Sequence, residues 1–358
     1  MDKIITNIIK KLENNGYNAY IVGGYVRDYL LGIDTNDIDI CTNALPKDVI
    51  SILKLVSDTK DNYGCVNLKT KKYNIDITTF RKESNYSKGK PMSIIFVNDI
   101  KSDLSRRDFT INALLMDKDG NVIDYFNGLK DLKDKIIRCI GDINKKINED
   151  PLRILRMARL KAKYDFKIDD ELKDFVKYNS KILLNISNYK IKEELDKMFS
   201  NQNKLEAIKT LDELNISDIL NLHTKNIKYT KDIMGIYAQL NNLNLPFTKL
   251  EKDTIIKIQE ILKQNKIDNN ILYKYGLYIC TIAGEILGIN TKDINKMFNK
   301  LPIKSKKDIK INIKTLVKLN NNCYNNINEI YSLLEYNIIN GIIKNNNREI
   351  VKFIRKKV

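Results

Sequence analysis

The change in sequence pattern at Asp150-Pro151 constrains the fold of this chain more than any other feature. Before it, apolar residues recur with the period of a strand in some segments and of a helix in others. After it, amphipathic helix patterns follow one another to the last residue. At 358 residues the chain is long enough for two or more domains. We therefore expect an α+β N-terminal domain with a mixed sheet and helices, followed by an all-helical region.

Individual elements can be expected on both sides of this change. In the N-terminal part the patterns predict helices over 1–12, 25–31 and 47–55, and strands over 18–22, at Asp37–Asp39, and over 66–70, 73–80 and 122–125. The strand patterns at 66–70 and 73–80 flank a short turn, so they predict a hairpin. In the C-terminal part the clearest helix patterns cover 151–164, 190–199, 204–214 and 254–263.

Composition limits the class of protein. Lys and Arg outnumber Asp and Glu by 62 to 45, and the net charge of +17 favours a polyanionic partner such as nucleic acid, although lysines on every solvated face also explain it. Five scattered cysteines without a CxxC pair and a single histidine argue against a structural zinc site and a Ser-His-Asp triad. We find no signal peptide and no membrane-spanning run, so we expect a soluble cytoplasmic protein with reduced thiols.

Asp37-Ile38-Asp39 is the first candidate site. In a strand, residues i and i+2 point to the same face, so both carboxylates can reach one metal ion. An isolated acidic pair is weak evidence, but Gly23-Gly24 precedes it between a predicted strand and a predicted helix, where backbone N–H groups can meet phosphate. Such carboxylate pairs hold Mg²⁺ in phosphoryl transfer. Asp76 is the candidate for a third carboxylate, and is equally well an ordinary outward-facing strand residue.

A second cluster is Arg106-Arg107-Asp108. Adjacent arginines beside an acid can form a surface ion network, which contributes little to stability. Alternatively, the guanidinium groups can bind a triphosphate while Asp108 recognises a hydroxyl group. The neighbouring Phe109 and Ile111 are expected to anchor this segment in the core.

A third cluster begins at Asp150-Pro151, a typical helix start with Asp at N-cap and Pro at N1. Capping does not explain Arg153, Arg156 and Arg159, which recur every three residues near the N-terminal half of the same helix. Because cations there oppose the helix dipole, we expect an anionic group to offset them. Asp150 and Arg153 can also present an acceptor and donors to the edge of a base.

The three clusters, in this order and spacing, resemble the class II tRNA nucleotidyltransferase and poly(A) polymerase family, most closely its bacterial CCA-adding enzymes. The resemblance is strong from about residue 20 to 166, weak through 189–195, and limited to helix content beyond 200. It implies a polymerase-β-like catalytic head over 1–140, a helical neck with the base-reading motif over 141–200, a helical body over 201–300 and a tRNA-binding tail over 301–358.

The resemblance also implies roles for single residues. These are Mg²⁺ binding for Asp37 and Asp39; nucleotide binding for Gly23, Gly24 and Arg27; triphosphate and ribose contacts for Arg107 and Asp108; base recognition for Asp150 and Arg153; and support of the nucleotide site for Arg156 and Arg159.

The activity implied is template-independent addition of C, C and A to the 3′ end of tRNA, bound by its acceptor and TΨC arm, from CTP and ATP with release of pyrophosphate. Monomer and homodimer are both open. The sequence departs from the family pattern at two places. Asn36 stands where the family often has a basic residue, just before the acidic pair. The segment Lys88-Gly89-Lys90-Pro91 lacks the arginine-rich stretch that the family usually has in this loop, which is needed to add the terminal A. An A-adding or CC-adding enzyme with a partner, a bacterial poly(A) polymerase and an inactive RNA-binding module remain alternatives.

Overall fold

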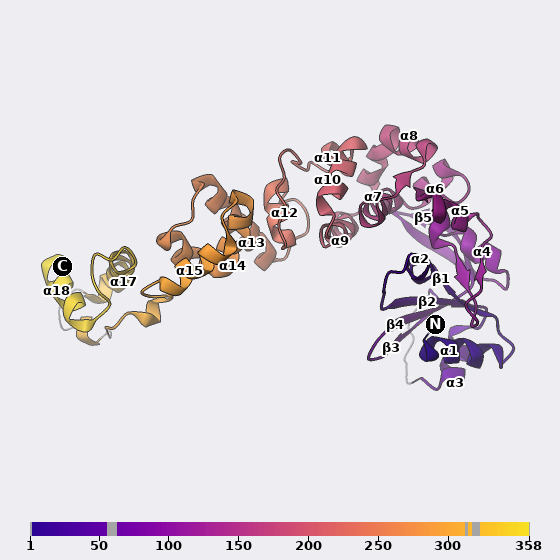
Figure 1. The fold of residues 1–358 in the computed structure, drawn as a ribbon, viewed down its shortest axis with the longest axis horizontal. Helices are drawn as coiled ribbons and strands as arrows, with labels where there is room; N and C mark the ends of the chain where they lie inside the picture. Colours follow the sequence, from indigo (N-terminus) through magenta and orange to yellow (C-terminus); the bar gives the residue numbers. More distant parts are fainter. Residues whose placement is uncertain (1, 56–62, 312–313, 317–322, 358) are drawn as a thin grey trace. The chain divides into compact units, whose positions relative to one another are not determined.

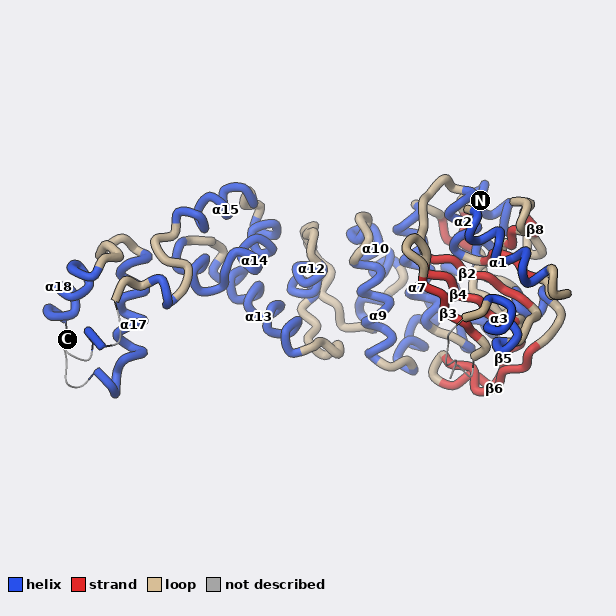
Figure 2. Tube along the Cα trace, turned by 90° about the horizontal axis from the view of Figure 1, so that it is seen from below, coloured by secondary structure: helices blue, strands red, loops and turns tan. Residues whose placement is uncertain are grey.

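A computed structural model describes residues 2–55, 63–311, 314–316 and 323–357 (Figure 1). The chain divides into two compact units, Met1–Asn221 and Leu222–Val358. The first unit contains every described strand, and the second contains only helices and loops among its described residues (Figure 2). The expected α+β fold with a helical C-terminal region is therefore confirmed.

A six-stranded mixed sheet forms the centre of the first unit. Its order is β3-β4-β2-β1-β7-β8, in which β2 and β4 are parallel and the other neighbours are antiparallel. The predicted hairpin is present as β3 and β4, and the acidic pair opens β2. The bounds are β1 Ala19–Val22, β2 Asp37–Thr42, β3 Cys65–Lys69, β4 Asn74–Thr79, β7 Leu115–Met116 and β8 Val122–Ile123.

The side chains of β2 alternate between core and site. Ile38 and Ile40 are buried, whereas Asp37 and Asp39 are exposed on the opposite face. Helices α1 (Lys3–Glu13) and α3 (Pro46–Leu53) lie side by side along the sheet (Figures 1 and 2). The apolar stripe of α1 is buried, which leaves the carboxylate face of β2 for the site.

The segment after β4 differs from its prediction as a loop. It forms a two-stranded hairpin of β5 (Arg81–Ser87) and β6 (Lys90–Phe96), with Lys88 and Gly89 in the turn. The residues of β5 are mostly charged or polar, so the sequence has no apolar alternation that would predict a strand here. The backbone ladder and the ion pairs of Arg81 and Glu83 hold the strand instead.

Helices surround the sheet and continue from it to residue 221. Helix α7 follows Asp150, and begins one residue later than predicted. One short strand, β10 (Lys167–Ile168), pairs with β9 (Ile136–Ile137) beyond the point where strand patterns end. The helices are α2 Gly24–Leu30, α4 Ile100–Ser105, α5 Gly128–Asp134, α6 Ile143–Glu149, α7 Leu152–Tyr164, α8 Asp170–Asn179, α9 Asn188–Phe199, α10 Lys204–Glu213 and α11 Ile216–Ile219, with 3-10 turns η1 Thr110–Asn112 and η2 Ser180–Asn185.

The second unit is built from helices with an isoleucine-rich core. Ile303, Leu316, Ile338 and Ile350 are among the buried residues of one cluster within it. No helix in the described ranges is long and apolar enough to span a bilayer. The elements are α12 Ile233–Leu240, α13 Lys249–Gln264, α14 Asn269–Leu287, α15 Thr291–Lys300, η3 Lys306–Asp308, α17 Cys323–Ile339 and α18 Asn347–Lys357.

Candidate active site

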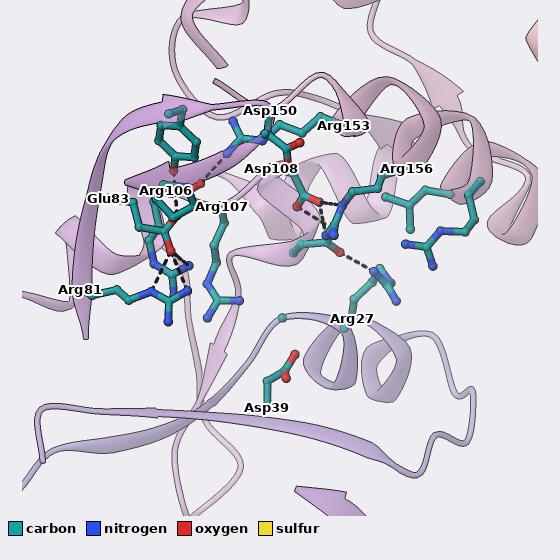
Figure 3. A pocket seen from close by; sticks show the side chains of 18 of the residues that line it. Arg27, Asp39, Arg81, Glu83, Arg106, Arg107, Asp108, Asp150, Arg153 and Arg156 are labelled. Carbon is teal, nitrogen blue, oxygen red and sulfur yellow. Dashed lines mark hydrogen bonds and ion pairs between the residues drawn. The ribbon is translucent and has the colours of Figure 1, made fainter. Parts of the chain in front are cut away.

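A cavity of about 470 Å³ opens beside the carboxylate face of the sheet (Figure 3). It is large enough for a nucleotide-sized ligand. Eight cationic side chains line it against four carboxylates, so it favours an anion. Ten of the twelve predicted site residues line it, whereas Asp37 and Asp76 do not. The ten are Gly23, Gly24, Arg27, Asp39, Arg107, Asp108, Asp150, Arg153, Arg156 and Arg159.

The three candidate metal carboxylates lie on two neighbouring strands. Asp39 on β2 and Asp76 on β4 are register partners, and Asp37 is two residues before Asp39. Asp37 accepts a hydrogen bond from Asn74 Nδ2 at 3.0 Å, and Asp76 accepts one from Asn67 Nδ2 at 2.6 Å. Burial raises the pKa of Asp39; Arg107 opposes this shift, and the charges of Asp76 and Asp37 add to it.

This donor set suits a divalent cation. In the described part of the chain the Asp39 carboxylate forms neither a hydrogen bond nor an ion pair, so its charge is available to a cation in the cavity. Carboxylate oxygens are ligands for hard ions such as Mg²⁺. No group of three or more His, Cys, Asp or Glu side chains among the described residues is placed to hold a metal ion. Mg²⁺ does not need one, because it is usually bound by one or two carboxylates together with substrate phosphates.

Gly23 allows the other parts of the site to approach the acidic pair. It follows β1 with φ of +78°, in the left-handed region that favours glycine. A Cβ atom there would lie 3.2 Å from Arg107 Nη1 and 3.3 Å from Asp39 Oδ2. Glycine therefore keeps space between the arginine and the carboxylate, where a phosphate group can enter.

Arg27 is the buried centre of a network that joins α2 to α7. Its guanidinium donates to Asp28 Oδ1 at 2.8 and 2.9 Å, to Asn112 Oδ1, and to the hydroxyl oxygen of Tyr164 at 2.5 Å. The Tyr164 hydroxyl in turn donates to Asp28 Oδ1 at 2.6 Å. Because Arg27 is only 6% exposed, this network fixes the orientation of its charge at the cavity wall.

Asp108 is a buried carboxylate that accepts hydrogen bonds from other side chains of the site. Its Oδ1 accepts from the Phe109 N–H and from Asn112 Nδ2, and its Oδ2 accepts from Arg156 Nε at 2.8 Å. Arg156 and these hydrogen bonds outweigh burial and hold the Asp108 pKa well below its usual range. Both oxygens are thus engaged within the protein, and the suggested role in hydroxyl recognition stays a prediction.

The stability lost on replacing Asp108 should depend on pH. Since its folded pKa is lowered, its contribution to stability is full above its unfolded pKa of about 4 and is lost as the pH falls below that value. We expect Asp108→Asn to lower the free energy of unfolding by about 2 kcal/mol at neutral pH, and by progressively less below about pH 4. Thermal melting followed by circular dichroism checks this, with Asp34→Asn at an exposed position as the control. A difference that stays constant from neutral to acid pH would contradict it.

The two arginines of the second cluster face different partners. Arg106 donates to Asp103 Oδ1 at 2.9 Å and to Glu83 Oε1 at 3.0 Å, and so belongs to a buried ion network with the β5 strand. Arg107 lies 3.6 Å from Asp103 Oδ2 and extends toward Asp39 across the cavity (Figure 3). Arg106 therefore belongs to an ion network, whereas phosphate binding by Arg107 stays a prediction.

The hairpin supplies site residues that sequence reasoning missed. Arg81, Glu83 and Tyr86 line the cavity, and Glu83 Oε2 accepts from the Tyr86 hydroxyl at 2.7 Å. The spacing of two residues between Arg81 and Glu83 could have predicted this, because residues at that spacing point to the same face of a strand. Lys163 and Tyr164, at the end of α7, were also missed.

Arg153 lies in the first turn of α7, but the predicted cap is wrong by one residue: Pro151 is the N-cap, and Asp150 precedes it as the C-cap of α6. Asp150 Oδ1 accepts from the Leu152 N–H at 3.2 Å, and burial raises the Asp150 pKa. Arg153 is 5% exposed and donates from Nη1 to the Lys146 carbonyl at 3.1 Å and from Nη2 to the Arg106 carbonyl at 2.8 Å. A guanidinium has five N–H groups, so these two contacts anchor it and leave donors for a ligand.

The turn of the hairpin meets Asp150. A Cβ atom at Gly89 would lie 2.8 Å from Asp150 Oδ1, and Gly89 has φ of +69°. Lys190 on α9 donates from Nζ to the carbonyls of Lys88 and Gly89, each at 3.1 Å. The segment that departs from the family pattern in sequence is thus in contact with the proposed base-reading residue.

The rest of the arginine stripe is offset by protein carboxylates. Arg156 pairs with Asp108 at 2.5 Å, and Arg159 pairs with Glu194 on α9 at 3.1 Å. The anionic partners expected from the helix dipole are therefore present within the fold.

The sheet, the acidic pair on β2 and the cation-lined cavity define a nucleotidyltransferase head. Residues 19–138 match the family model for the poly A polymerase head domain, and residues 239–354 match that for tRNA nucleotidyltransferase domain 2.

The curated relatives extend this match over the whole chain. A CCA-adding enzyme from Ligilactobacillus salivarius is 33% identical over 98% of this chain and 95% of its own length. One from Staphylococcus haemolyticus is 29% identical over 98% of this chain and 97% of its own length. The chain belongs to the family of CCA-adding enzymes, which are tRNA nucleotidyltransferases that depend on a divalent metal.

Solved structures share the fold. The Bacillus stearothermophilus CCA-adding enzyme in complex with CTP has a TM-score of 0.85 at 24% identity, with coverage of 100% of this chain and 98% of the other. The Thermotoga maritima CCA-adding enzyme complexed with tRNA has a TM-score of 0.71 at 21% identity, with coverage of 100% and 96%.

Proposed function

We propose that this protein adds C, C and A, without a nucleic-acid template, to the 3′ end of tRNA from CTP and ATP. The terminal tRNA hydroxyl attacks the α-phosphate, the bond to the bridging oxygen breaks, and pyrophosphate leaves. The main support for the proposal is that Asp39, Arg107 and residues at the start of α7 line the same cavity. It combines a metal-binding carboxylate, a phosphate-binding cation and side chains that can face a base.

Asp37 and Asp39 are the residues that would hold Mg²⁺. Bound there, Mg²⁺ would lower the pKa of the attacking hydroxyl and neutralise charge on the phosphates. The protein contributes a fixed carboxylate pair on β2, with a cavity next to it from which Arg107 approaches the same space.

The remaining residues bind and orient the nucleotide. Arg27 and Arg107 neutralise phosphate oxygens, Gly23 and Gly24 leave room for them, and the Arg27 network keeps that cation in place. Asp150 and Arg153 present an acceptor and donors to the Watson–Crick edge of the base, which replaces a template.

Arg156 and Arg159 support this arrangement from the same face of α7. Asp108 orients Arg156, and Glu194 orients Arg159. Positive charge at this wall also stabilises a triphosphate in the cavity.

We also propose the division into head, neck, body and tail at residues 140, 200 and 300, with the lysine-rich helices beyond the head following the tRNA backbone. This proposal rests on the match of residues 239–354 and on the charge of the chain. We expect the protein to act in the cytoplasm, where its cysteine thiols would remain reduced.

An incorporation assay tests the function. The protein is incubated with Mg²⁺ and tRNA ending before CCA, after C or after CC, with CTP and ATP given separately and together. Ordered completion of CCA on all three substrates is expected. Long A tails would identify a poly(A) polymerase, and products limited to A or to CC would identify an enzyme that works with a partner.

Asp76→Asn tests whether a third carboxylate takes part. If Asp76 contributes to the metal site, the variant should lower kcat by about a hundredfold with unchanged tRNA affinity. Asp48→Asn, in the first turn of α3, is the matched control. Activity within about twofold of the unmodified protein would make Asp76 an ordinary strand residue.

A further inference from the structure

Three consecutive backbone carbonyls at the end of α4 are held by two cations from later helices. Lys146 on α6 donates from Nζ to the Ser105 carbonyl and, at 3.4 Å, to the Arg107 carbonyl. Arg153 on α7 donates to the Arg106 carbonyl between them at 2.8 Å. The last carbonyls of a helix lack partners within it, and cations are favoured there. The turn that carries Arg106 and Arg107 is therefore capped from outside.

Lys146 is an unusual residue for a purely structural cap. It is 8% exposed, and within the described part of the chain it forms no ion pair with a carboxylate. Burial and the neighbouring Arg153 lower its pKa to about 8. Keeping an ammonium group at such a place costs free energy that an apolar side chain would avoid. At this buried position the ammonium group contacts the turn that carries Arg107.

The two cations are also linked to each other. Arg153 Nη1 donates to the carbonyl of Lys146 at 3.1 Å, near the end of α6. The turn at 105–107 and the start of α7 are thus joined through one set of hydrogen bonds. A displacement of the turn would move the phosphate-facing Arg107 relative to Asp150.

We propose that Lys146 is a positioning residue for the triphosphate. It holds the Ser105–Arg107 turn so that Arg107 extends into the cavity, and it serves CTP and ATP alike because it acts at the phosphates. This inference rests on the proposed function, since it takes a nucleoside triphosphate as the ligand of the cavity.

The experiment compares Lys146→Met and Lys146→Arg with the unmodified full chain. Lys145→Met removes the same charge from the exposed neighbouring position and is the control. Affinity for inorganic tripolyphosphate, measured by calorimetry, reports on the phosphate site without any incorporation. KM and kcat are measured for CTP and for ATP, together with tRNA affinity and the melting temperature.

We expect Lys146→Met to weaken tripolyphosphate binding and to raise the KM for CTP and for ATP, each by about tenfold. An effect of this size corresponds to the loss of one charged hydrogen-bonding partner. The ratio of C to A incorporation and the tRNA affinity should not change. Lys146→Arg should restore most of the binding, since it keeps a cation at the carbonyls, and Lys145→Met should behave as the unmodified protein. Should Lys146→Met not fold, the neutral and shorter Lys146→Gln is measured by the same criteria.

Unchanged tripolyphosphate affinity in the neutral variant would overturn the proposal. So would a loss of nucleotide and tRNA binding together that Lys146→Arg does not restore, because that pattern marks a general structural role. An unmodified protein that incorporates neither nucleotide refutes the proposed function instead. The tripolyphosphate comparison then decides the role of Lys146 by itself.

Discussion

Asp39→Asn is expected to lower nucleotide incorporation by about a thousandfold or more. The substitution keeps the shape of the side chain and removes the charge that faces the cavity. Asp39 is the member of the acidic pair that lines the cavity, and among the described residues its carboxylate has no partner that the change would disturb. The loss should therefore lie in kcat, and single-turnover incorporation of CTP into tRNA ending before CCA measures it.

Two controls separate catalysis from folding and binding in this experiment. Asp34→Asn removes the same charge from a nearby exposed position outside the cavity and should retain full activity. The tRNA affinity of Asp39→Asn should equal that of the unmodified protein, because one carboxylate in the head is a small part of an RNA interface. Incorporation at a normal rate by Asp39→Asn would show that the metal site lies elsewhere.

Arg107→Met should lower kcat/KM for both nucleotides by about a hundredfold, as expected for loss of one preorganised charge at a phosphate. Arg107 points across the cavity toward Asp39, and its only ion pair among the described residues is the long contact to Asp103 (Figure 3). Its charge is thus available to a ligand. Arg107 is proposed to act on the phosphates, whereas Asp150 is proposed to contact the base. The choice between C and A should therefore stay the same.

Arg138→Met is the matched control for this variant. Arg138 also pairs with carboxylates, Asp131 and Asp169, but it does not line the cavity. Steady-state kinetics with each nucleotide should leave this control within about twofold of the unmodified protein. A changed ratio of C to A in Arg107→Met, with normal kcat/KM for one nucleotide, would assign the arginine to the base instead of the phosphates.

The sequence predicted those parts of the molecule that local patterns determine. The alternation around Ile38 and Ile40 was enough to place the acidic pair on a half-buried strand, and Phe109 and Ile111 are fully buried as expected. The three clusters that meet in the cavity were also visible, because each combines residue types that serve one chemistry. The confirmed fold class follows from these local signals.

Partners distant in sequence could not be predicted in the same way. Nothing near Asp108 indicates that Arg156, 48 residues later in the sequence, would donate to its Oδ2. The hairpin strand at Arg81 is stabilised by cross-strand pairing and by Arg106, so its own residues lack an apolar pattern. Lys146 gives no local signal at all, since its role depends on carbonyls some forty residues earlier.

All residues that line the cavity belong to the first unit, Met1–Asn221. The side chains proposed to carry the chemistry and the choice of base therefore all come from the first unit. Under the proposed function, a substitution in the second unit is expected to leave the choice of nucleotide unchanged as long as RNA is still bound. RNA affinity and nucleotide choice should then be separable by mutation.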